Sequence, residues 1–299
     1  MNEYVSVIIP TFNSTNYIEE TILSITSFYP EKYLDIIIVD DCSDDVKKLK
    51  KLENKYSCLT VIEKTLKTNA ADSRNIGIRN AKYNKVFLLD SDDLYAESYI
   101  SHRVSLMNSS KCTIYFGAFY EVDRYGKSKL VSQEYNCGDI REYLFVKKGD
   151  FRTSTISINK ELFKDTFFDE KQYKHQDWGF GIRVYDNKEN IYYDQEPFVK
   201  VCSGRHKQMS SQMNIPASKY FLENYLLDSK YRLHFIRIHY VNALIQKDKG
   251  ALAFFDKLLR ECDLNTKDKL RYFILSLLHS KIFFPLAPTV ISMLKKKLN

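Results

Sequence analysis

Three carboxylates occur within four residues, at Asp90, Asp92 and Asp93, directly after the apolar run Val86–Leu89. Like charges this close repel one another, and burying them without partners is costly. A divalent cation removes the conflict, because Mg²⁺ and Mn²⁺ prefer carboxylate oxygens and Mg²⁺ is commonly held by one or two carboxylates plus substrate phosphates. The cluster therefore predicts a metal–phosphate site. The alternative is an acidic turn that caps a helix beginning near Ala96.

The elements that precede this cluster alternate between strand and helix. Apolar runs predict strands buried on both faces of a mostly parallel sheet, at 5–9, 34–39, 59–63 and 86–89. Helical spacing separates them, at 17–28, 46–56 and 69–81. This order predicts a doubly wound α/β sheet with right-handed crossovers, which binds ligands at the carboxyl ends of its strands. We expect Pro10–Asn13, Asp40–Asp41 and Asp90–Asp92 to share that edge.

The pattern changes after residue 110. We expect helices at 96–107, 139–146 and 176–187, and strands at 113–122, 155–158, 191–193 and 198–202. Short strands and polar loops of this kind suit an acceptor-binding half, and from Pro216 the chain is expected to be helical. We therefore predict one domain over 1–215, with a nucleotide-binding half (1–110) and an acceptor-binding half (111–215), followed by a helical region over 216–299.

Composition limits the class of protein. The chain has 299 residues with 44% apolar and 28% charged side chains, as in globular proteins. Its six cysteines are scattered without a C-x-x-C pair, and no secretory signal opens the sequence. These features favour a reducing cytoplasm and give no support for a disulfide frame or a zinc site.

Positive charge is concentrated in the C-terminal region. Residues 216–299 carry fifteen Lys and Arg against seven Asp and Glu, whereas the first 215 residues carry 30 against 31. This indicates an acidic partner, either membrane phospholipid or nucleic acid, but the motifs of nucleic-acid binding are missing. The stretch 273–294 contains Lys281, Pro285 and Pro288, so we expect two short amphipathic helices on an anionic membrane surface, with Lys295–Lys297 on the polar side. The alternative is a helical appendage with a solvated basic end.

Four segments in order resemble the nucleotide-sugar site of glycosyltransferases of family 2, which have the GT-A fold. They are V-S-V-I-I-P-T-F-N (5–13), I-I-I-V-D-D-C-S-D-D (36–45), A-D-S-R-N-I-G-I (71–78) and L-L-D-S-D-D (88–93). The resemblance covers roughly the first 110 residues. It implies an inverting transfer of one sugar, dependent on Mn²⁺ or Mg²⁺, from a UDP-sugar to a glycan or lipid-linked glycan. The setting would be bacterial capsule, lipopolysaccharide or exopolysaccharide assembly at the cytoplasmic face of the plasma membrane.

Residues in these segments receive donor roles. Asp41 can accept from the uracil N3–H, because a carboxylate only accepts hydrogen bonds. Phe12 and the backbone around Pro10, in a loop with Thr11 and Asn13, can cover the base, although Phe12 could instead be a core residue. The resemblance implies that Asp90 reaches ribose and metal and that Asp92, beside Ser91, binds the cation. Arg74 can pair with the acidic edge or a phosphate, or form a structural ion pair. Gly77 permits close approach of helix and strand.

The second half is expected to supply the general base. Asp177 is the candidate, in the segment His175-Gln176-Asp177-Trp178, where the chain's only tryptophan offers an acceptor-sugar platform. The alternative is that Asp177 caps a helix. Gln176 departs from the family's acidic pair, so Asp169 and Glu170 are alternative bases.

The loop over 202–210 resembles a flexible loop that closes over the donor. In it, Arg205 and Lys207 could clamp the diphosphate and His206 could bind the metal, or be a bystander. The Q-x-x-R-W signature of processive synthases is absent, which favours transfer of a single sugar.

Two other classes compete. A nucleotidyltransferase needs a glycine-rich, basic loop after the first strand, and Pro10–Thr15 is neither. A non-catalytic nucleotide-sugar or glycan-binding module would tolerate loss of Asp177 and the acidic pair, and both are present.

Overall fold

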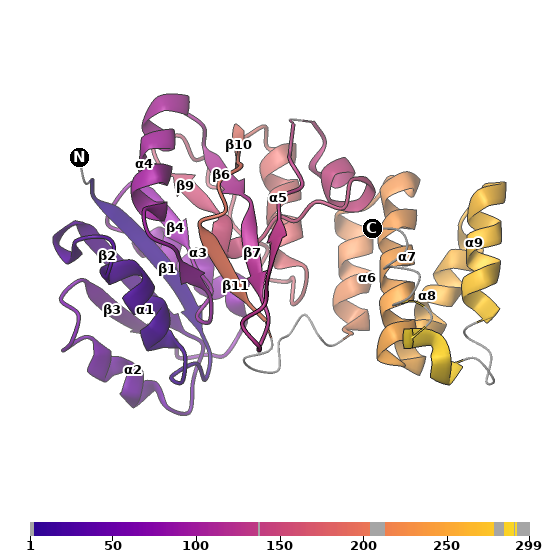
Figure 1. Cartoon of the computed structure of the whole chain (residues 1–299), viewed down its shortest axis with the longest axis horizontal. Helices are drawn as coiled ribbons and strands as arrows, with labels where there is room; N and C mark the ends of the chain where they lie inside the picture. The colour runs from indigo at the N-terminus through magenta and orange to yellow at the C-terminus, as the bar shows by residue number, and fades with distance from the viewer. Residues whose placement is uncertain (1–2, 137, 204–212, 278–283, 290, 292–299) are drawn as a thin grey trace. The chain divides into compact units, whose positions relative to one another are not determined.

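The computed structural model describes residues 3–136, 138–203, 213–277, 284–289 and 291 (Figure 1). The chain divides into two compact units, Met1–Gln208 and Met209–Asn299. Within the described ranges, no helix combines the length and apolar character that crossing a membrane requires.

The larger unit is built on a seven-stranded sheet with the order β10-β6-β9-β4-β1-β2-β3. Its strands are β1 (Val5–Thr11), β2 (Leu34–Asp40), β3 (Leu59–Glu63), β4 (Lys85–Leu88), β6 (Ile114–Gly117), β9 (Ser157–Asn159) and β10 (Ile191–Asp194). All neighbours are parallel except β9, which runs antiparallel to both β4 and β6. The predicted mostly parallel α/β sheet is confirmed.

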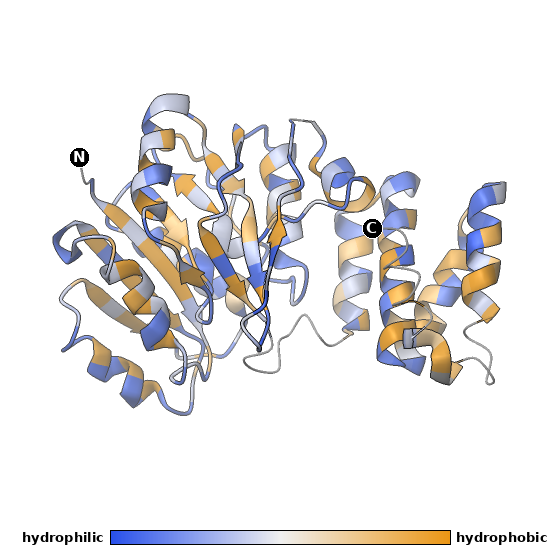
Figure 2. Ribbon diagram, viewed as in Figure 1, coloured by the Kyte–Doolittle hydropathy of each residue, from blue (hydrophilic) through white to orange (hydrophobic). Residues whose placement is uncertain are grey.

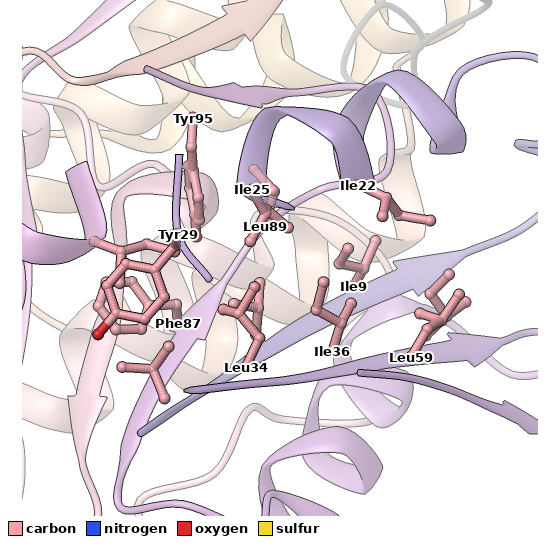
Figure 3. Packing of buried hydrophobic residues seen from close by; sticks show 14 of the residues in the cluster. Ile9, Ile22, Ile25, Tyr29, Leu34, Ile36, Leu59, Phe87, Leu89 and Tyr95 are labelled. Carbon is pink, nitrogen blue, oxygen red and sulfur yellow. The ribbon is translucent and has the colours of Figure 1, made fainter. Parts of the chain in front are cut away.

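Helices cover both faces of this sheet. They are α1 (Ile18–Thr26), α2 (Val46–Leu52), α3 (Ala70–Asn80), α4 (Tyr99–Ser110) and α5 (Gln176–Asp186), with short helical turns η1 (Glu31–Tyr33), η2 (Glu142–Val146) and η3 (Thr153–Thr155). In Figure 3, Ile22 and Ile25 of α1 lie over Ile9 and Ile36 of the sheet. Because strand side chains alternate between faces, Ile8 faces the other way, where α3 packs.

Gly77 permits this contact between α3 and β1. A Cβ atom built at Gly77 would lie 2.1 Å from Cγ2 of Ile8. A side chain of any size would push helix and strand apart, as the sequence predicted for this glycine.

A second, four-stranded sheet has the order β5-β11-β7-β8. Its strands are β5 (Leu94–Tyr95), β7 (Phe119–Val122), β8 (Ser128–Val131) and β11 (Val199–Cys202). The single strand expected over 113–122 is wrong, because it divides into β6 and β7 in different sheets. Gly117 lies at the division, where a Cβ atom would meet the Asp194 carbonyl oxygen at 2.1 Å and Ala118 N donates to that oxygen at 2.9 Å.

The helix expected near Ala96 begins instead at Tyr99, after β5. Ser98, in the left-handed region with a φ of 67°, is its N-cap. The acidic cluster therefore does not cap this helix, and that alternative is wrong.

The smaller unit is helical, as predicted. Its helices are α6 (Ile215–Asn224), α7 (Ser229–Gln246), α8 (Lys249–Glu261), α9 (Thr266–Leu277) and the short turn η5 (Phe284–Leu286). The side chains of Asn214, Asp228 and Asp248 cap α6, α7 and α8. The region expected to contact a membrane starts at residue 273, and its first residues belong to α9. Lys281 and Lys295–Lys297 lie outside the described residues.

Candidate active site

The loops that follow β1, β2 and β4 meet at one edge of the main sheet. Thr11 is in register with Asp40, and Asp41 N donates to the Thr11 carbonyl oxygen at 2.9 Å. Ser91 Oγ lies 2.9 Å from Ser14 Oγ, which joins the loop after β4 to the loop after β1. The structure therefore brings together the three loops that the strand order indicated.

The loop after β1 presents an aromatic ring to solvent. Phe12 is 45% exposed, so it is not a core residue, and the Lys67 ammonium lies over its ring at 2.9 Å from the centroid. Pro10 and Thr11 are buried within β1. Asn13 has a φ of 51° and is fixed by two hydrogen bonds with Asp44, at 3.2 and 3.0 Å. Phe12 is thus a surface residue, with Lys67 over one face of its ring.

Asp41 is held by two donors on a single oxygen. The Lys64 ammonium and the Thr68 backbone N–H both contact Oδ1, at 2.7 and 2.8 Å. Among the described residues no donor contacts Oδ2. Asp41 therefore presents one oriented acceptor oxygen to a ligand N–H.

Lys64 is the charge that makes this arrangement stable. Its side chain is 6% exposed and also contacts Asp72 at 2.7 Å. Burial lowers the pKa of Lys64, but hydrogen bonds to Asp41 and Asp72 outweigh it, so the pKa lies above its usual range and the group stays cationic. Sequence reasoning missed Lys64, and the available signal was a lone lysine directly after β3.

Arg74 links the acidic edge to α5. Its guanidinium donates to Asp90 Oδ1 at 2.6 Å and to Gln176 Oε1 at 2.9 Å. Gln176 is fixed in turn by donating to the Gln172 carbonyl oxygen at 2.8 Å. Of the roles expected for Arg74, the structure contains the ion pair with an aspartate, Asp90. The neutral Gln176 accepts a second hydrogen bond from the same guanidinium.

The aspartates of the opening cluster lie in different environments. Asp93 is buried and accepts from Ser154 Oγ and from Cys202 N, the latter at 2.8 Å. Burial, and then the charges of Asp90 and Asp92, raise the pKa of Asp93 well above its ordinary value. Asp93 is thus a buried structural residue, whereas Asp90 and Asp92 are partly exposed.

These two carboxylates fit a divalent cation only with help from a substrate. The described residues contain no group of three or more His, Cys, Asp or Glu arranged to hold a metal. Asp90 is 32% exposed at its side chain and uses Oδ1 for Arg74. Two hard oxygen ligands suit Mg²⁺ or Mn²⁺ when phosphates and water complete the shell. Arg205, His206 and Lys207 lie outside the described residues.

Asp177 is placed in the first turn of α5 with a raised pKa. The N-cap of α5 is His175, so the helix-cap alternative for Asp177 is wrong. Burial raises the pKa of Asp177 to about 6, against the lowering effect of Arg152 and with a further rise from Asp150. Arg152 contacts Asp150 at 2.7 Å. Asp177 is half-buried, and a carboxylate with this pKa is suited to accept a proton near neutral pH.

Aromatic rings lie beside Asp177. Trp178 stacks on His175 with centroids 5.1 Å apart and meets Phe145 edge-on at 5.5 Å. Asp169 accepts from Lys171 N at 3.0 Å, Glu170 accepts from Asn75 at 2.8 Å, and Asp177 accepts from Trp178 N at 2.9 Å, so it is the raised pKa of Asp177, about 6, and its aromatic neighbours that favour it. Asp177 is therefore the best-placed candidate base, and Trp178 the candidate sugar platform.

Comparison with known proteins gives the family. The glycosyl transferase family 2 profile matches residues 6–179. The amylovoran biosynthesis glycosyltransferase AmsB of Erwinia amylovora is 32% identical over 196 residues, which are 60% of this chain and 63% of AmsB. The poly(ribitol-phosphate) beta-N-acetylglucosaminyltransferase TarP of Staphylococcus aureus is 31% identical over 171 residues, or 54% of this chain and 52% of TarP. The chain thus covers less than two thirds of each relative.

Solved structures share the fold. S. aureus TarS 1-349 in complex with UDP-GlcNAc superposes with a TM-score of 0.64 at 20% identity, covering 85% of this chain and 81% of that one. The UDP complex of the same protein gives a TM-score of 0.60 at 20% identity, covering 86% and 78%. The GT-A fold with a helical C-terminal region is therefore confirmed. Because the family profile matches more than half of the sequence, the chain belongs to glycosyl transferase family 2.

Proposed function

We propose that this protein transfers one sugar residue from a UDP-sugar to a glycan or lipid-linked glycan, with inversion and with Mn²⁺ or Mg²⁺. The place would be bacterial surface-polysaccharide assembly, such as capsule, lipopolysaccharide or exopolysaccharide, at the inner face of the plasma membrane. The observation that carries the proposal is Asp41, whose Oδ2 accepts from no donor in the described part of the chain and which lies at the same sheet edge as Asp90 and Asp92. This edge offers one acceptor for a base N–H and two ligands for a diphosphate-bound cation.

Relatives support the donor and the setting. AmsB is named for amylovoran biosynthesis, and TarP for transfer of N-acetylglucosamine to poly(ribitol-phosphate). The TarS structures hold UDP-GlcNAc and UDP. The nucleotides held by TarS support a UDP-sugar donor for this chain, and the polymers named for AmsB and TarP support a polymer acceptor.

The donor half would position the nucleotide. Asp41 Oδ2 would accept the uracil N3–H, and Phe12 would cover the flat face of the base. A cytosine ring has an acceptor at N3, so Asp41 would reject it by repulsion between acceptors. Asp90 and Asp92 would hold the cation, which neutralises charge on the departing diphosphate when bound.

The acceptor half would supply the proton transfer. Asp177 would take the proton from the acceptor hydroxyl. The hydroxyl oxygen would bond to the anomeric carbon as the bond from that carbon to the UDP oxygen breaks. Attack opposite the leaving group inverts the anomeric configuration. Trp178 would pack against the acceptor sugar and exclude water from Asp177.

The test measures nucleotide binding and release with UDP-, GDP-, CMP- and dTDP-sugars, with and without Mn²⁺, using water or a panel of glycans as acceptor. We expect release from a UDP-sugar, loss of metal-dependent donor binding in Asp92→Ala, and retained binding without transfer in Asp177→Asn. Asp169→Asn is the matched carboxylate control and should remain active. Donor binding without release would indicate the non-catalytic module, and no binding of any nucleotide sugar would refute the proposal.

A further inference from the structure

Helix α9 turns an apolar stripe toward solvent. Leu270, Phe273, Ile274 and Leu277 are 60%, 59%, 48% and 47% exposed. They follow the spacing i, i+3, i+4, i+7, which places them on one face of a helix. In a helix that packs on a core, this is the face that would be buried. Figure 2 shows the apolar residues along α9.

The polar face of α9 is the face that packs on its own unit. Asp268 is buried and accepts from Arg237 of α7 at 2.9 Å. Tyr272 donates its hydroxyl to Asp256 of α8 at 2.8 Å. These contacts fix the rotation of the helix about its axis, so the outward direction of the apolar stripe is set by specific partners.

Lysines border the stripe on both sides. At about 100° per residue, Lys267 and Lys269 project about 70° and 90° to either side of the centre of the stripe. Both are exposed, and neither forms an ion pair with another described residue. The one acidic residue of α9 is Asp268, which lies on the buried face. The outward face is therefore apolar in the middle and positive at its borders.

We propose that α9 lies flat on an anionic phospholipid surface. The stripe would enter the boundary between headgroups and acyl chains, and the two lysines would reach the lipid phosphates. The surrounding region supports this charge match, because residues 216–299 carry fifteen basic against seven acidic side chains. A second copy of the chain suits this face less well, since an α9–α9 contact would bring lysines together with no exposed acid between them.

This inference rests on the proposed function in one respect: membrane binding by α9 would hold the enzyme at a lipid-linked acceptor. The test of membrane binding contains no nucleotide sugar. Membrane binding can therefore be absent while sugar transfer is found, or be found while sugar transfer is absent.

The experiment is sedimentation of the full chain with phosphatidylcholine vesicles, with and without phosphatidylglycerol, at low and high salt. We expect binding only to anionic vesicles and weaker binding at high salt. Phe273→Glu should reduce the partition coefficient by about tenfold or more, because it removes an inserted aromatic and adds a negative charge. Lys267→Glu with Lys269→Glu should abolish binding while leaving the stripe intact.

Leu227→Glu is the matched control, because Leu227 is 81% exposed in the same unit but lies outside α9. It should bind as the unaltered chain does. Equal loss in Leu227→Glu, equal binding to neutral vesicles, or no binding to anionic vesicles would overturn the proposal. Self-association without lipid that Phe273→Glu abolishes would also overturn it, and would assign the stripe to a second copy.

Discussion

Asp177 is the residue whose environment most directly predicts a pH dependence. Its pKa is raised to about 6, chiefly by burial. A general base must be deprotonated to act, so the transfer rate should fall about tenfold per pH unit well below pH 6 and level off above about pH 7. The measurement is kcat as a function of pH with saturating donor and acceptor.

Asp177→Asn provides the comparison for this profile. It should lower kcat by about 10²- to 10⁴-fold and remove the inflection near pH 6, while leaving donor affinity unchanged. If the variant kept the same inflection, the titrating group would lie elsewhere, and Asp93 would be examined next because its pKa is also raised.

Lys64 predicts a link between stability and nucleotide binding. Lys64→Met leaves the buried Asp41 and the half-buried Asp72 without their shared cation, which should cost about 3 kcal/mol in the free energy of unfolding. Asp41 also loses one of the two donors that orient it, so UDP should bind more weakly. Urea unfolding and titration calorimetry with UDP measure the two effects.

The double variant Lys64→Met with Asp72→Asn separates the effect on stability from the effect on UDP binding. Neutralising Asp72 removes one of the two stranded charges, so part of the stability should return, whereas the affinity for UDP should stay low. Full recovery of UDP affinity would show that Lys64 acts on stability alone.

Residues directly after strands were the ones the sequence could place. Asp41 and Asp90 follow apolar runs, and the ends of parallel strands share an edge, so their proximity could be inferred from the order of elements. Lys64 and Arg152 could not be inferred in this way. Each is a single basic residue in an unremarkable segment. Lys64 pairs with Asp41, 23 residues away, and Arg152, which pairs with Asp150, also lowers the pKa of the distant Asp177. Long-range pairing of isolated charges leaves no local pattern.

At the scale of elements, the contact between α3 and β1 depends on Gly77. A Cβ at this position would lie 2.1 Å from Cγ2 of Ile8, so Gly77→Ala should destabilise the protein by about 1–3 kcal/mol despite the better helix propensity of alanine. The free energy of unfolding in urea measures the loss.

The paired variant Ile8→Ala tests the cause. It removes the clashing methyl group, so the double variant should be less destabilised than the sum of the two single variants. Additive losses would mean that the helix shifts without meeting Ile8. Gly250→Ala is the matched control, because a Cβ there would meet no atom closer than 3.5 Å.

The strand predicted over 113–122 is wrong for a physical reason. The run over 113–122 has strong strand propensity throughout, and propensity carries no information about which sheet each part joins. The division at Gly117 is imposed by close approach of the Asp194 backbone. The strand β8 was missed because Ser128–Val131 is largely exposed and lacks an apolar run.

At the scale of the whole molecule, the two units differ in charge. The first 215 residues are nearly neutral and hold the candidate site, while the excess of basic residues follows them. A sheet edge with clustered aspartates would repel a bare diphosphate, so donor binding should depend on the cation more strongly at low than at high ionic strength.

The fluorescence of Trp178 reports the unfolding of the unit that holds the candidate site, separately from the helical unit. It is the only tryptophan of the chain and lies in α5, within Met1–Gln208. Ligand at 100 times its Kd stabilises the native state by about 2.7 kcal/mol, which should raise the unfolding midpoint seen by Trp178 fluorescence by about 5–10 °C. UDP with Mn²⁺ should produce this shift and CDP with Mn²⁺ should produce little, because only uracil offers an N3–H to Asp41. Asp41→Asn should narrow the difference between the two nucleotides, since an amide can both donate and accept. Equal shifts with UDP and CDP in the unaltered chain would show that Asp41 does not read the base.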